Sequence, residues 1–383
     1  MLLLFQVAAQ VLSLTNSLGI YIHIPFCKSK CTYCNFYSFC GNDLQKEEYT
    51  LALCRDIVVR GKQINRRVTS VYFGGGTPSV LSTEQLCRIL NAIKQNFSVV
   101  EDAEITIEAN PADNLGEMLP ELRKVGFNRL SLGVQSANSD ELKVLGRRHT
   151  KEDAANAVKV ARQNGFNNIS LDLMLGLPKS TTEELKNSLE FLCSLSPEHI
   201  SAYILKLERG TPLFEAGISL PNDDETAEQY LFACRYLKDN GYSHYEISNF
   251  AKKNFEARHN TLYWKCGEYL GFGPSAHSYF GSKRFFYENN IDSYILGDAP
   301  VDDGIGGTMD EYIMLGLRLK DGISNTQFNN LFGKDLPKAL FQKASLYQKN
   351  GLCHTDGEKI SLTDEGMLLS NSIITSFLEE FNL

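Results

Sequence analysis

The chain has 383 residues, of which 43% are hydrophobic and 22% are charged, and its formal net charge is −8. This length predicts one large α/β domain followed by a smaller one. The acidic balance argues against nucleic acid as the main partner, because phosphate binding needs clustered Lys and Arg and no basic stripe is visible. No apolar stretch is long enough to span a membrane.

Residues 1–18 start with an apolar run that lacks a basic region and is interrupted by Gln6, Gln10, Ser13 and Asn16. A secretory signal needs a basic start, and a transit peptide is rich in Arg. We therefore expect an N-terminal extension, or a start codon upstream of the native one.

A short apolar strand from Ile20 to Ile24 is followed by a CxxxCxxC motif, formed by Cys27, Cys31 and Cys34. Three thiolates on one loop hold three irons of a [4Fe–4S] cluster, and the fourth iron stays open because no cysteine follows two residues later. An open iron can take the amino and carboxylate groups of S-adenosylmethionine (SAM), which places the sulfonium beside the cluster. The motif therefore predicts a radical SAM site.

Two other uses of the cysteines remain open. Cys40 offers a fourth ligand for a structural zinc site, although such sites usually pair one CxxC with a second, distant pair. A disulfide framework fits poorly with ten cysteines scattered over the chain. We expect most cysteines outside the motif to be ordinary buried thiols. Free thiols and an oxygen-sensitive cluster indicate the reducing cytosol.

Short β-rich runs alternate with helical patterns over the first two thirds of the chain, which is typical of parallel strands joined by helices. Capping-box patterns at Ser82 with Gln85, and at Thr150 with Asp153, mark two helix starts. Eight strand–helix units would close a barrel, so six units predict an open one. The predicted strands are Ile20–Ile24, Val71–Phe73, Glu104–Glu108, Arg129–Val134, Ile169–Leu173 and Ile200–Leu205.

Polar side chains and glycines follow these strands, at the end where parallel α/β folds collect their functional groups. A glycine-rich turn comes after the second strand, where backbone N–H groups can approach a ligand closely. Glu108, Gln135 and Asp172 are placed to hydrogen-bond ribose hydroxyls or an ammonium group, and Arg147 to pair with a carboxylate. We expect these residues to form one polar ring that faces the cysteine loop.

The segment after Gly241 changes character. HYEISNFAK predicts one further strand, and residues 251–303 then form a connecting region rich in aromatic and histidine side chains. Such a mixture suits a flat aromatic ligand at the mouth of the barrel. The alternative is that Tyr263 and Trp264 belong to the core and that His259 is a structural histidine with satisfied hydrogen bonds.

Residues 304–383 are mostly helical, with a hairpin-like interruption at LCHTDGEKISLTDEG, which predicts a small winged-helix-like domain. Such folds often bind DNA. From Ile305 onwards, however, seven Lys or Arg face ten Asp or Glu, a net charge of −3. A lid or a partner-docking role therefore fits better than DNA binding.

Six motifs now occur in a fixed order: YIHIPFCKSKCTYC, FGGGTPS, IEANP, LGVQS, LGRRH and LDLMLGLP. Together they resemble the oxygen-independent coproporphyrinogen III oxidase (HemN-like) family of radical SAM proteins, from Gly19 to the C-terminus. The resemblance implies an α/β fold with a partial (β/α)6 TIM-like radical SAM barrel over residues 19–250. It also implies a C-terminal, mostly helical, HemN-like domain over residues 304–383.

The resemblance also implies roles for individual residues at matching positions. The cluster ligands would be Cys27, Cys31 and Cys34. The SAM site would be lined by Tyr21, Tyr33, Gly75, Gly76, Thr77, Glu108, Gln135, Arg147 and Asp172.

Two departures from the oxidases bear on function. The oxidases extend the cysteine motif to CxxxCxxCxC, whereas the last position here is Phe36. In addition, residues 259–264 fit an HNxxYW pattern that resembles the HemW branch, whose members bind haem and hand it to apoproteins such as respiratory haem enzymes. This resemblance makes His259 a candidate haem contact. The second SAM that approaches the GFGPSAHS region in the oxidases is not carried over, because His277 occupies that position.

We therefore expect a cytoplasmic haem chaperone with a SAM-binding [4Fe–4S] cluster, which acts without coproporphyrinogen oxidase activity. Its expected partners are haem and apo haem proteins, for example those of the respiratory chain. Nucleic acid is not an expected partner. Peripheral contact with a membrane and a homodimer stay open. One alternative function is the oxidase itself, which decarboxylates two propionates of coproporphyrinogen III. Another is a non-catalytic regulator with an iron–sulfur sensor.

Overall fold

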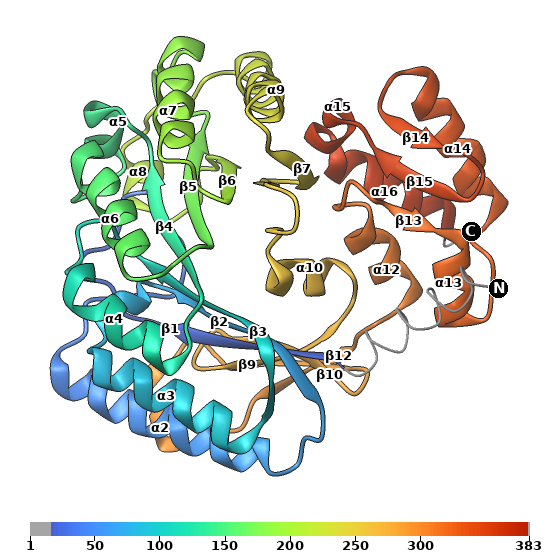
Figure 1. Ribbon diagram of the computed structural model, residues 1–383. Coiled ribbons are helices and arrows are strands. Elements are labelled where there is room, and N and C mark those ends of the chain that lie inside the picture. Colours follow the sequence, from blue (N-terminus) through green and yellow to red (C-terminus); the bar gives the residue numbers. More distant parts are fainter. Residues whose placement is uncertain (1–16, 382–383) are drawn as a thin grey trace.

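The computed structural model describes residues 17–381 (Figure 1). The predicted N-terminal extension lies outside the described residues over positions 1–16, whereas Ser17 and Leu18 already belong to the first strand. Within the described range, none of the helices has both the length and the apolar character needed to cross a bilayer.

Six parallel strands lie side by side in chain order at the centre of the molecule. All six predicted strands are confirmed, and four begin earlier than predicted, as β1 does at Ser17 and β3 at Ser98. Both faces of β5 are almost entirely buried, as expected for a parallel sheet covered by helices. The strands are β1 (Ser17–Ile24), β2 (Arg67–Gly75), β3 (Ser98–Ala109), β4 (Arg129–Gln135), β5 (Ile169–Leu175) and β6 (His199–Ile204).

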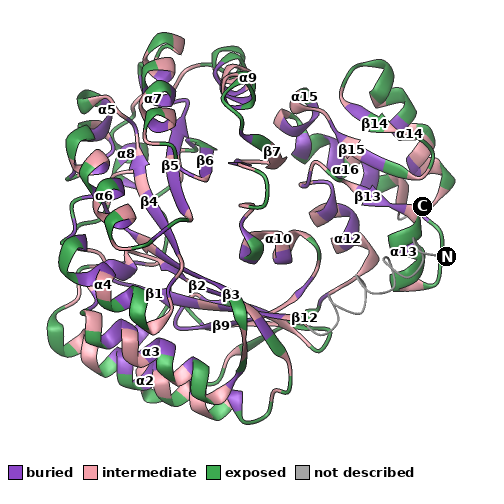
Figure 2. Ribbon diagram, viewed as in Figure 1, coloured by how far each residue is buried: buried purple, intermediate pink, exposed green. Residues whose placement is uncertain are grey.

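Helices cover the outer face of this sheet, with their buried sides inward and their exposed sides towards solvent (Figure 2). The capping boxes at Ser82 with Gln85 and at Thr150 with Asp153 are confirmed as the starts of α3 and α6. The helical elements of this part are α2 (Asp43–Gly61), η1 (Pro78–Val80), α3 (Thr83–Asn96), α4 (Leu115–Val125), α5 (Ser139–Val144), α6 (Lys151–Gln163), α7 (Thr182–Ser194), α8 (Pro212–Glu215) and α9 (Asp223–Asp239).

The parallel run ends after β6. The single strand predicted over HYEISNFAK is wrong in detail, because this segment forms two short antiparallel strands, β7 (Ser243–Glu246) and β8 (Asn249–Ala251). β8 pairs antiparallel with β6 and so stops the βα pattern on that side.

On the other side of β1, residues 268–305 add four strands that the sequence did not predict. β9 pairs parallel with β1, and the remaining three follow antiparallel, which gives one sheet of twelve strands. The sheet has free ends at β12 and β7, so the barrel is open, as predicted. The elements are α10 (Arg258–Trp264), β9 (Glu268–Phe272), β10 (His277–Phe280), β11 (Lys283–Phe286), α11 (Ile291–Leu296) and β12 (Val301–Ile305).

The C-terminal part is mostly helical and carries a small antiparallel sheet of three strands in the order β13-β15-β14, a winged-helix-like arrangement as predicted. It lies beside β7 (Figure 1), where the backbone N–H of Lys320 donates to Tyr245 O over 3.0 Å. The boundaries assigned to the domains stay predictions. The elements are α12 (Met309–Gly316), β13 (Ile323–Ser324), α13 (Asn325–Phe332), α14 (Lys338–Lys349), β14 (Cys353–Thr355), β15 (Lys359–Leu362), α15 (Asp364–Leu368) and α16 (Ser370–Phe381).

Candidate functional site

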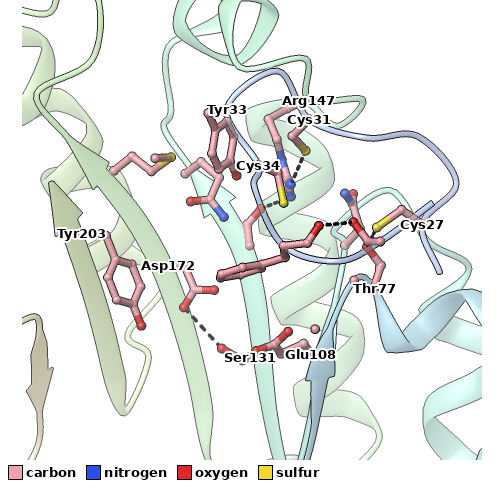
Figure 3. A pocket seen from close by; sticks show the side chains of 18 of the residues that line it. Cys27, Cys31, Tyr33, Cys34, Thr77, Glu108, Ser131, Arg147, Asp172 and Tyr203 are labelled. Atoms are coloured by element: carbon pink, nitrogen blue, oxygen red, sulfur yellow. Dashed lines mark hydrogen bonds between the residues drawn. The ribbon is translucent and has the colours of Figure 1, made fainter. Parts of the chain in front are cut away.

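A cavity of about 520 Å³ opens at the carboxyl ends of the six parallel strands. The cysteine loop after β1, the glycine-rich turn after β2 and side chains from β3 to β6 form its wall. Figure 3 shows the sulfur atoms of Cys27, Cys31 and Cys34 on one side of this space and the carboxylates of Glu108 and Asp172 on the other. The predicted ring of polar groups facing the cysteine loop therefore exists.

The cysteine loop is fixed to the barrel by backbone hydrogen bonds. The N–H of Cys27 donates to Phe39 O over 2.9 Å, and that of Thr32 to Leu145 O over 3.2 Å. Thr32 O in turn accepts the N–H of Leu213 over 2.8 Å. Since these bonds reach α5 and α8, the loop is held in place before any cofactor binds.

Two donors point at the cysteine sulfurs. Thr77 Oγ1 lies 3.5 Å from Cys27 Sγ, and Arg147 Nη1 lies 3.3 Å from Cys31 Sγ. Burial raises the pKa of the Cys27 and Cys34 thiols, so the thiolate form at these positions needs a positive partner. A metal cluster supplies that charge, and the Arg147 guanidinium adds to it.

The three cysteines suit a cluster better than a single ion. Among the described residues, they do not form a group whose three ligand atoms all lie within 4.8 Å of one another. One tetrahedral zinc would hold its sulfur ligands about 3.8 Å apart, since Zn–S bonds are about 2.3 Å long. Cys40, the fourth ligand of the zinc alternative, is exposed and absent from the cavity wall. The donor set therefore fits a cluster with three protein ligands.

The glycine-rich turn supports the base of the cysteine loop. The N–H of Gly76 donates to Ile24 O, and that of Thr77 to Phe26 O, each over 2.8 Å. Gly75 has a φ of +107°, which favours glycine, and a Cβ there would lie 2.6 Å from the His23 ring. The turn and the loop thus depend on each other's backbone.

Two carboxylates lie on the floor of the cavity. The hydroxyl of Tyr72 donates to Glu108 Oε1 over 2.6 Å, and that of Ser131 to Asp172 Oδ1 over 3.3 Å. Burial raises the pKa of Glu108 to about 7 and that of Asp172 to about 6. Two neighbouring acids that resist ionisation favour a ligand that brings positive charge.

Arg147 closes the ring on the side of the cysteine loop. Its Nη2 donates to Gly133 O over 2.5 Å, while Nη1 points at Cys31. Gln135 ends β4 with a φ of 69° and also lines the cavity. The structure therefore brings together Cys27, Cys31, Cys34, Tyr33, Gly75, Gly76, Thr77, Glu108, Gln135, Arg147 and Asp172. Their roles towards a cofactor stay predictions.

Tyr21 and His259 are not part of the cavity wall. The Tyr21 hydroxyl lies 3.1 Å from His23 Nδ1, and its ring stacks on that of Tyr72 behind the cavity. His259 is 1% exposed, and both its ring nitrogens have partners. Nδ1 lies 2.9 Å from Ser70 Oγ, and Nε2 lies 2.6 Å from the Tyr263 hydroxyl.

Burial lowers the pKa of His259 to about 3, so the imidazole is neutral. An iron can bind its Nε2 only after the Tyr263 hydroxyl moves away. The next residue, Asn260, does line the cavity. The HNxxYW segment thus reaches the cavity through its asparagine in this conformation.

Several cavity residues were missed, although a simple signal was present. Successive side chains on a strand alternate between its faces, so every second residue of β4, β5 and β6 points the same way. Counting back by two from Gln135 reaches Gly133 and Ser131, and counting on from Asp172 reaches Met174. The other missed residues include Tyr72, Arg129, His199, Ser201, Tyr203 and Phe36, which is 62% exposed at the rim.

Two family models match the chain. The Radical SAM superfamily model matches residues 21–192, and the HemN C-terminal domain model matches residues 308–369. The first range contains the cysteine loop, the glycine-rich turn after β2 and the cavity residues Glu108, Gln135, Arg147 and Asp172. Radical SAM membership implies a [4Fe–4S] cluster and SAM as cofactors.

Curated relatives match along nearly the whole chain. The Heme chaperone HemW of Bacillus subtilis is 36% identical and is covered to 99%, with 94% of this chain aligned. That of Lactococcus lactis is 34% identical, with 94% of this chain and 96% of the relative covered. The mitochondrial radical S-adenosyl methionine domain-containing protein 1 of Danio rerio is 32% identical, with 95% and 88% covered.

The solved structure of coproporphyrinogen III oxidase (HemN) from Escherichia coli has a TM-score of 0.83 with this chain, at 25% identity. The match covers 97% of this chain and 93% of that one, so the barrel and the C-terminal part are arranged alike. With relatives above 30% identity over their full length, the chain belongs to the HemW family of HemN-like radical SAM proteins.

Proposed function

We propose that this protein is a haem chaperone that binds haem and delivers it to apoproteins, such as respiratory haem enzymes. The observation that carries the proposal is the full-length similarity to proteins named Heme chaperone HemW. Phe36 in place of the fourth cysteine of the oxidases, together with the HNxxYW segment, supports it. A cytosolic location and apo haem proteins as acceptors belong to this proposal, whereas peripheral contact with a membrane and a homodimer stay open.

Cys27, Cys31 and Cys34 would hold a [4Fe–4S] cluster, and Tyr33, Gly75, Gly76, Thr77, Glu108, Gln135, Arg147 and Asp172 would hold SAM beside it. Such a cluster would supply one electron to the sulfonium of SAM. Arg147 and Thr77 stabilise the thiolate charge through their donors on Cys31 and Cys27. Glu108 and Asp172 would accept hydrogen bonds from the ribose hydroxyls or the ammonium group of SAM. Tyr21 would support this wall from behind, through its stacking on Tyr72.

SAM affinity should rise with pH between pH 6 and pH 8. Burial holds the pKa of Glu108 at about 7, and a cationic ligand needs its carboxylate, so binding releases a proton. One pH unit below this pKa about a tenth of the carboxyl is ionised, so we expect affinity at pH 6 to be about tenfold lower than at pH 8. Equilibrium dialysis of the anaerobic protein with labelled SAM measures this change.

The Glu108→Gln variant is the control, because it removes the titrating group and keeps the shape. It should bind SAM more weakly at pH 8 and flatten the pH profile. A remaining change of about twofold would belong to Asp172, whose pKa is about 6, whereas an unchanged tenfold change would contradict the assignment to Glu108. A profile that falls with pH in the native protein contradicts the proposed role of both carboxylates.

His259→Ala should lower haem affinity at least tenfold and leave the cluster absorbance intact. The change removes the proposed haem contact, and it also frees the hydroxyls of Ser70 and Tyr263 in a buried site. Haem titration followed at the Soret band measures the affinity, while iron and sulfide content reports the cluster. Unchanged haem affinity would mean that another residue binds the iron.

Tyr263→Phe distinguishes a direct ligand from a structural role. If Nε2 binds iron, removing the hydroxyl that competes for it should leave haem affinity unchanged or increase it. If His259 only positions α10, losing this hydrogen bond should weaken haem binding as His259→Ala does. Weaker haem binding in Tyr263→Phe would indicate that a neighbour such as Asn260 contacts the haem instead of His259.

The second candidate function is oxygen-independent coproporphyrinogen III oxidase, and the high TM-score to the solved oxidase favours it. Anaerobic reconstitution with haem titration, with and without SAM, and with assays for 5′-deoxyadenosine and protoporphyrinogen IX, separates the two. A chaperone binds haem and forms no protoporphyrinogen IX. Conversion of coproporphyrinogen III without haem binding would overturn the proposal.

A further inference from the structure

Three side chains with metal-binding chemistry meet at the junction between the barrel and the C-terminal part. Cys234 comes from α9, His244 from β7 and Asp364 from the start of α15, which lie side by side (Figure 1). One donor atom of each lies within 4.8 Å of the other two. None of the three lines the cavity with the cysteine loop, so this cluster is separate from the radical SAM site.

The imidazole of His244 is fixed on three sides. Its Nδ1 lies 2.9 Å from Asp364 Oδ1, its ring stacks on Phe250 at 4.4 Å, and the Tyr230 ring packs edge-on. The side chain is only 8% exposed. Its Nε2 is buried and has no hydrogen-bond partner within residues 17–381. A metal shared with Asp364 would bind Nδ1, the nitrogen that faces the carboxylate, in place of its hydrogen bond to Oδ1, and the imidazole proton would then stand on Nε2.

The second donor is the buried thiol of Cys234, which is 3% exposed. Burial, together with the nearby Asp364 carboxylate, raises its pKa to about 12. Asp364 has a low pKa because it accepts hydrogen bonds from His244 and Lys320, and it is therefore ionised. The cluster thus combines a soft sulfur, an imidazole and a carboxylate, the ligand types that zinc uses in proteins.

We propose that Cys234, His244 and Asp364 bind one Zn²⁺ ion, with water as the fourth ligand. Zinc holds such ligands at about 2.0–2.3 Å, so neighbouring ligand atoms of a zinc site are about 3.3–3.8 Å apart. The three donor atoms here lie within 4.8 Å of one another, so they would have to approach one another by up to about 1.5 Å. Binding forms a Zn–S bond and releases the thiol proton of Cys234 to solvent. The thiolate and the carboxylate then balance the two charges of the ion.

The charge on Lys320 opposes this site and has to be accommodated. Its Nζ donates to Asp364 Oδ1 over 2.8 Å, and His244 Nδ1 shares the same oxygen. A metal would therefore bind through Asp364 Oδ2, while Oδ1 keeps its contact with Lys320. The negative charge of Glu365, the next residue in the chain, also raises the pKa of Cys234. This charge partly offsets that of the Lys320 ammonium group.

A zinc ion here would connect the C-terminal part to the barrel. Two of its ligands stand on α9 and β7, and the third stands on α15, in the chain segment matched by the HemN C-terminal domain model. Because a ligand that binds only the folded state stabilises it, Zn²⁺ should raise the melting temperature.

The test uses the full-length Cys27→Ser, Cys31→Ser, Cys34→Ser variant, so that the cysteine loop binds no added metal. Titration with Zn²⁺ against a colorimetric chelator should show about one bound ion per chain. Co²⁺ as a probe should give a thiolate-to-cobalt charge-transfer band. Introducing Cys234→Ser, His244→Ala or Asp364→Asn should lower zinc affinity at least tenfold, and Cys234→Ser should abolish the cobalt band.

The matched control is Cys353→Ser, which removes another buried free thiol from the C-terminal part without touching the cluster. It should keep both the zinc stoichiometry and the cobalt band. Asp364→Asn preserves the shape of the side chain, so a folded variant with weak zinc binding supports the site. Less than a tenth of an ion bound per chain, or equal binding by Cys234→Ser and Cys353→Ser, would overturn it.

Discussion

Cys31→Ala should abolish the iron–sulfur cluster of the reconstituted protein. The loop offers three thiolates, and a cluster that keeps one iron open needs all three. Cys31 also accepts the Arg147 donor at 3.3 Å, so its loss leaves a buried guanidinium beside the cavity with one partner fewer. Iron should fall from about four atoms per chain to below one, together with the broad visible absorbance of the cluster.

Cys40→Ala is the matched control for this prediction. Cys40 stands nine residues after Cys31 on the same loop, but it is exposed and does not line the cavity. Its thiol donates a hydrogen bond to Lys28 O. The variant should keep the iron and sulfide content of the native protein. Loss of the cluster in Cys40→Ala, or zinc in place of iron in native protein prepared without oxygen, would contradict the three-thiolate site.

The barrel and most of its site were predictable because both follow local rules. A parallel strand buried on both faces reads as a short apolar run, and its functional residues follow at its carboxyl end. Glu108 and Gln135 stand at two such ends, Asp172 lies in the middle of β5, and all three line one cavity. Order along the chain was enough to predict that they meet.

The strands beyond β8 were not predictable on these grounds. β9 to β12 are four or five residues long, and the pairing of β9 with β1 joins segments about 250 residues apart. Short strands carry little periodicity, and their pairing depends on the finished sheet. The same holds for His259, whose burial depends on Ser70 of β2 and on Tyr263.

The cluster of Cys234, His244 and Asp364 was even less predictable from the sequence. Asp364 lies 120 residues from His244 and belongs to a different part of the fold, and no motif spacing joins them. Each residue alone looks like an ordinary buried thiol, a lone histidine or an acid in the first turn of a helix. Only the docking of α15 beside α9 and β7 makes them neighbours.

Gly76→Ala should destabilise the protein by about 1–3 kcal/mol and lower its cluster content. A Cβ at this position would lie 2.6 Å from Phe26 O and 2.8 Å from Ile24 O. Both are backbone atoms of the segment that enters the cysteine loop, so neither can rotate away. The hydrogen bonds from Gly76 and Thr77 to these same oxygens must lengthen, and Cys27 must shift with them. Chemical denaturation and iron content measure the two effects.

Gly116→Ala is the matched control, because it adds the same methyl group at an open position. Gly116 is exposed in the first turn of α4, and its nearest neighbour would be Val160 Cγ1 at 4.0 Å. Alanine favours a helix over glycine, so this variant should be as stable as the native protein or up to about 1 kcal/mol more stable. Its cluster content should not change. If Gly76→Ala also kept full stability and iron, the turn after β2 would not be what holds the cysteine loop.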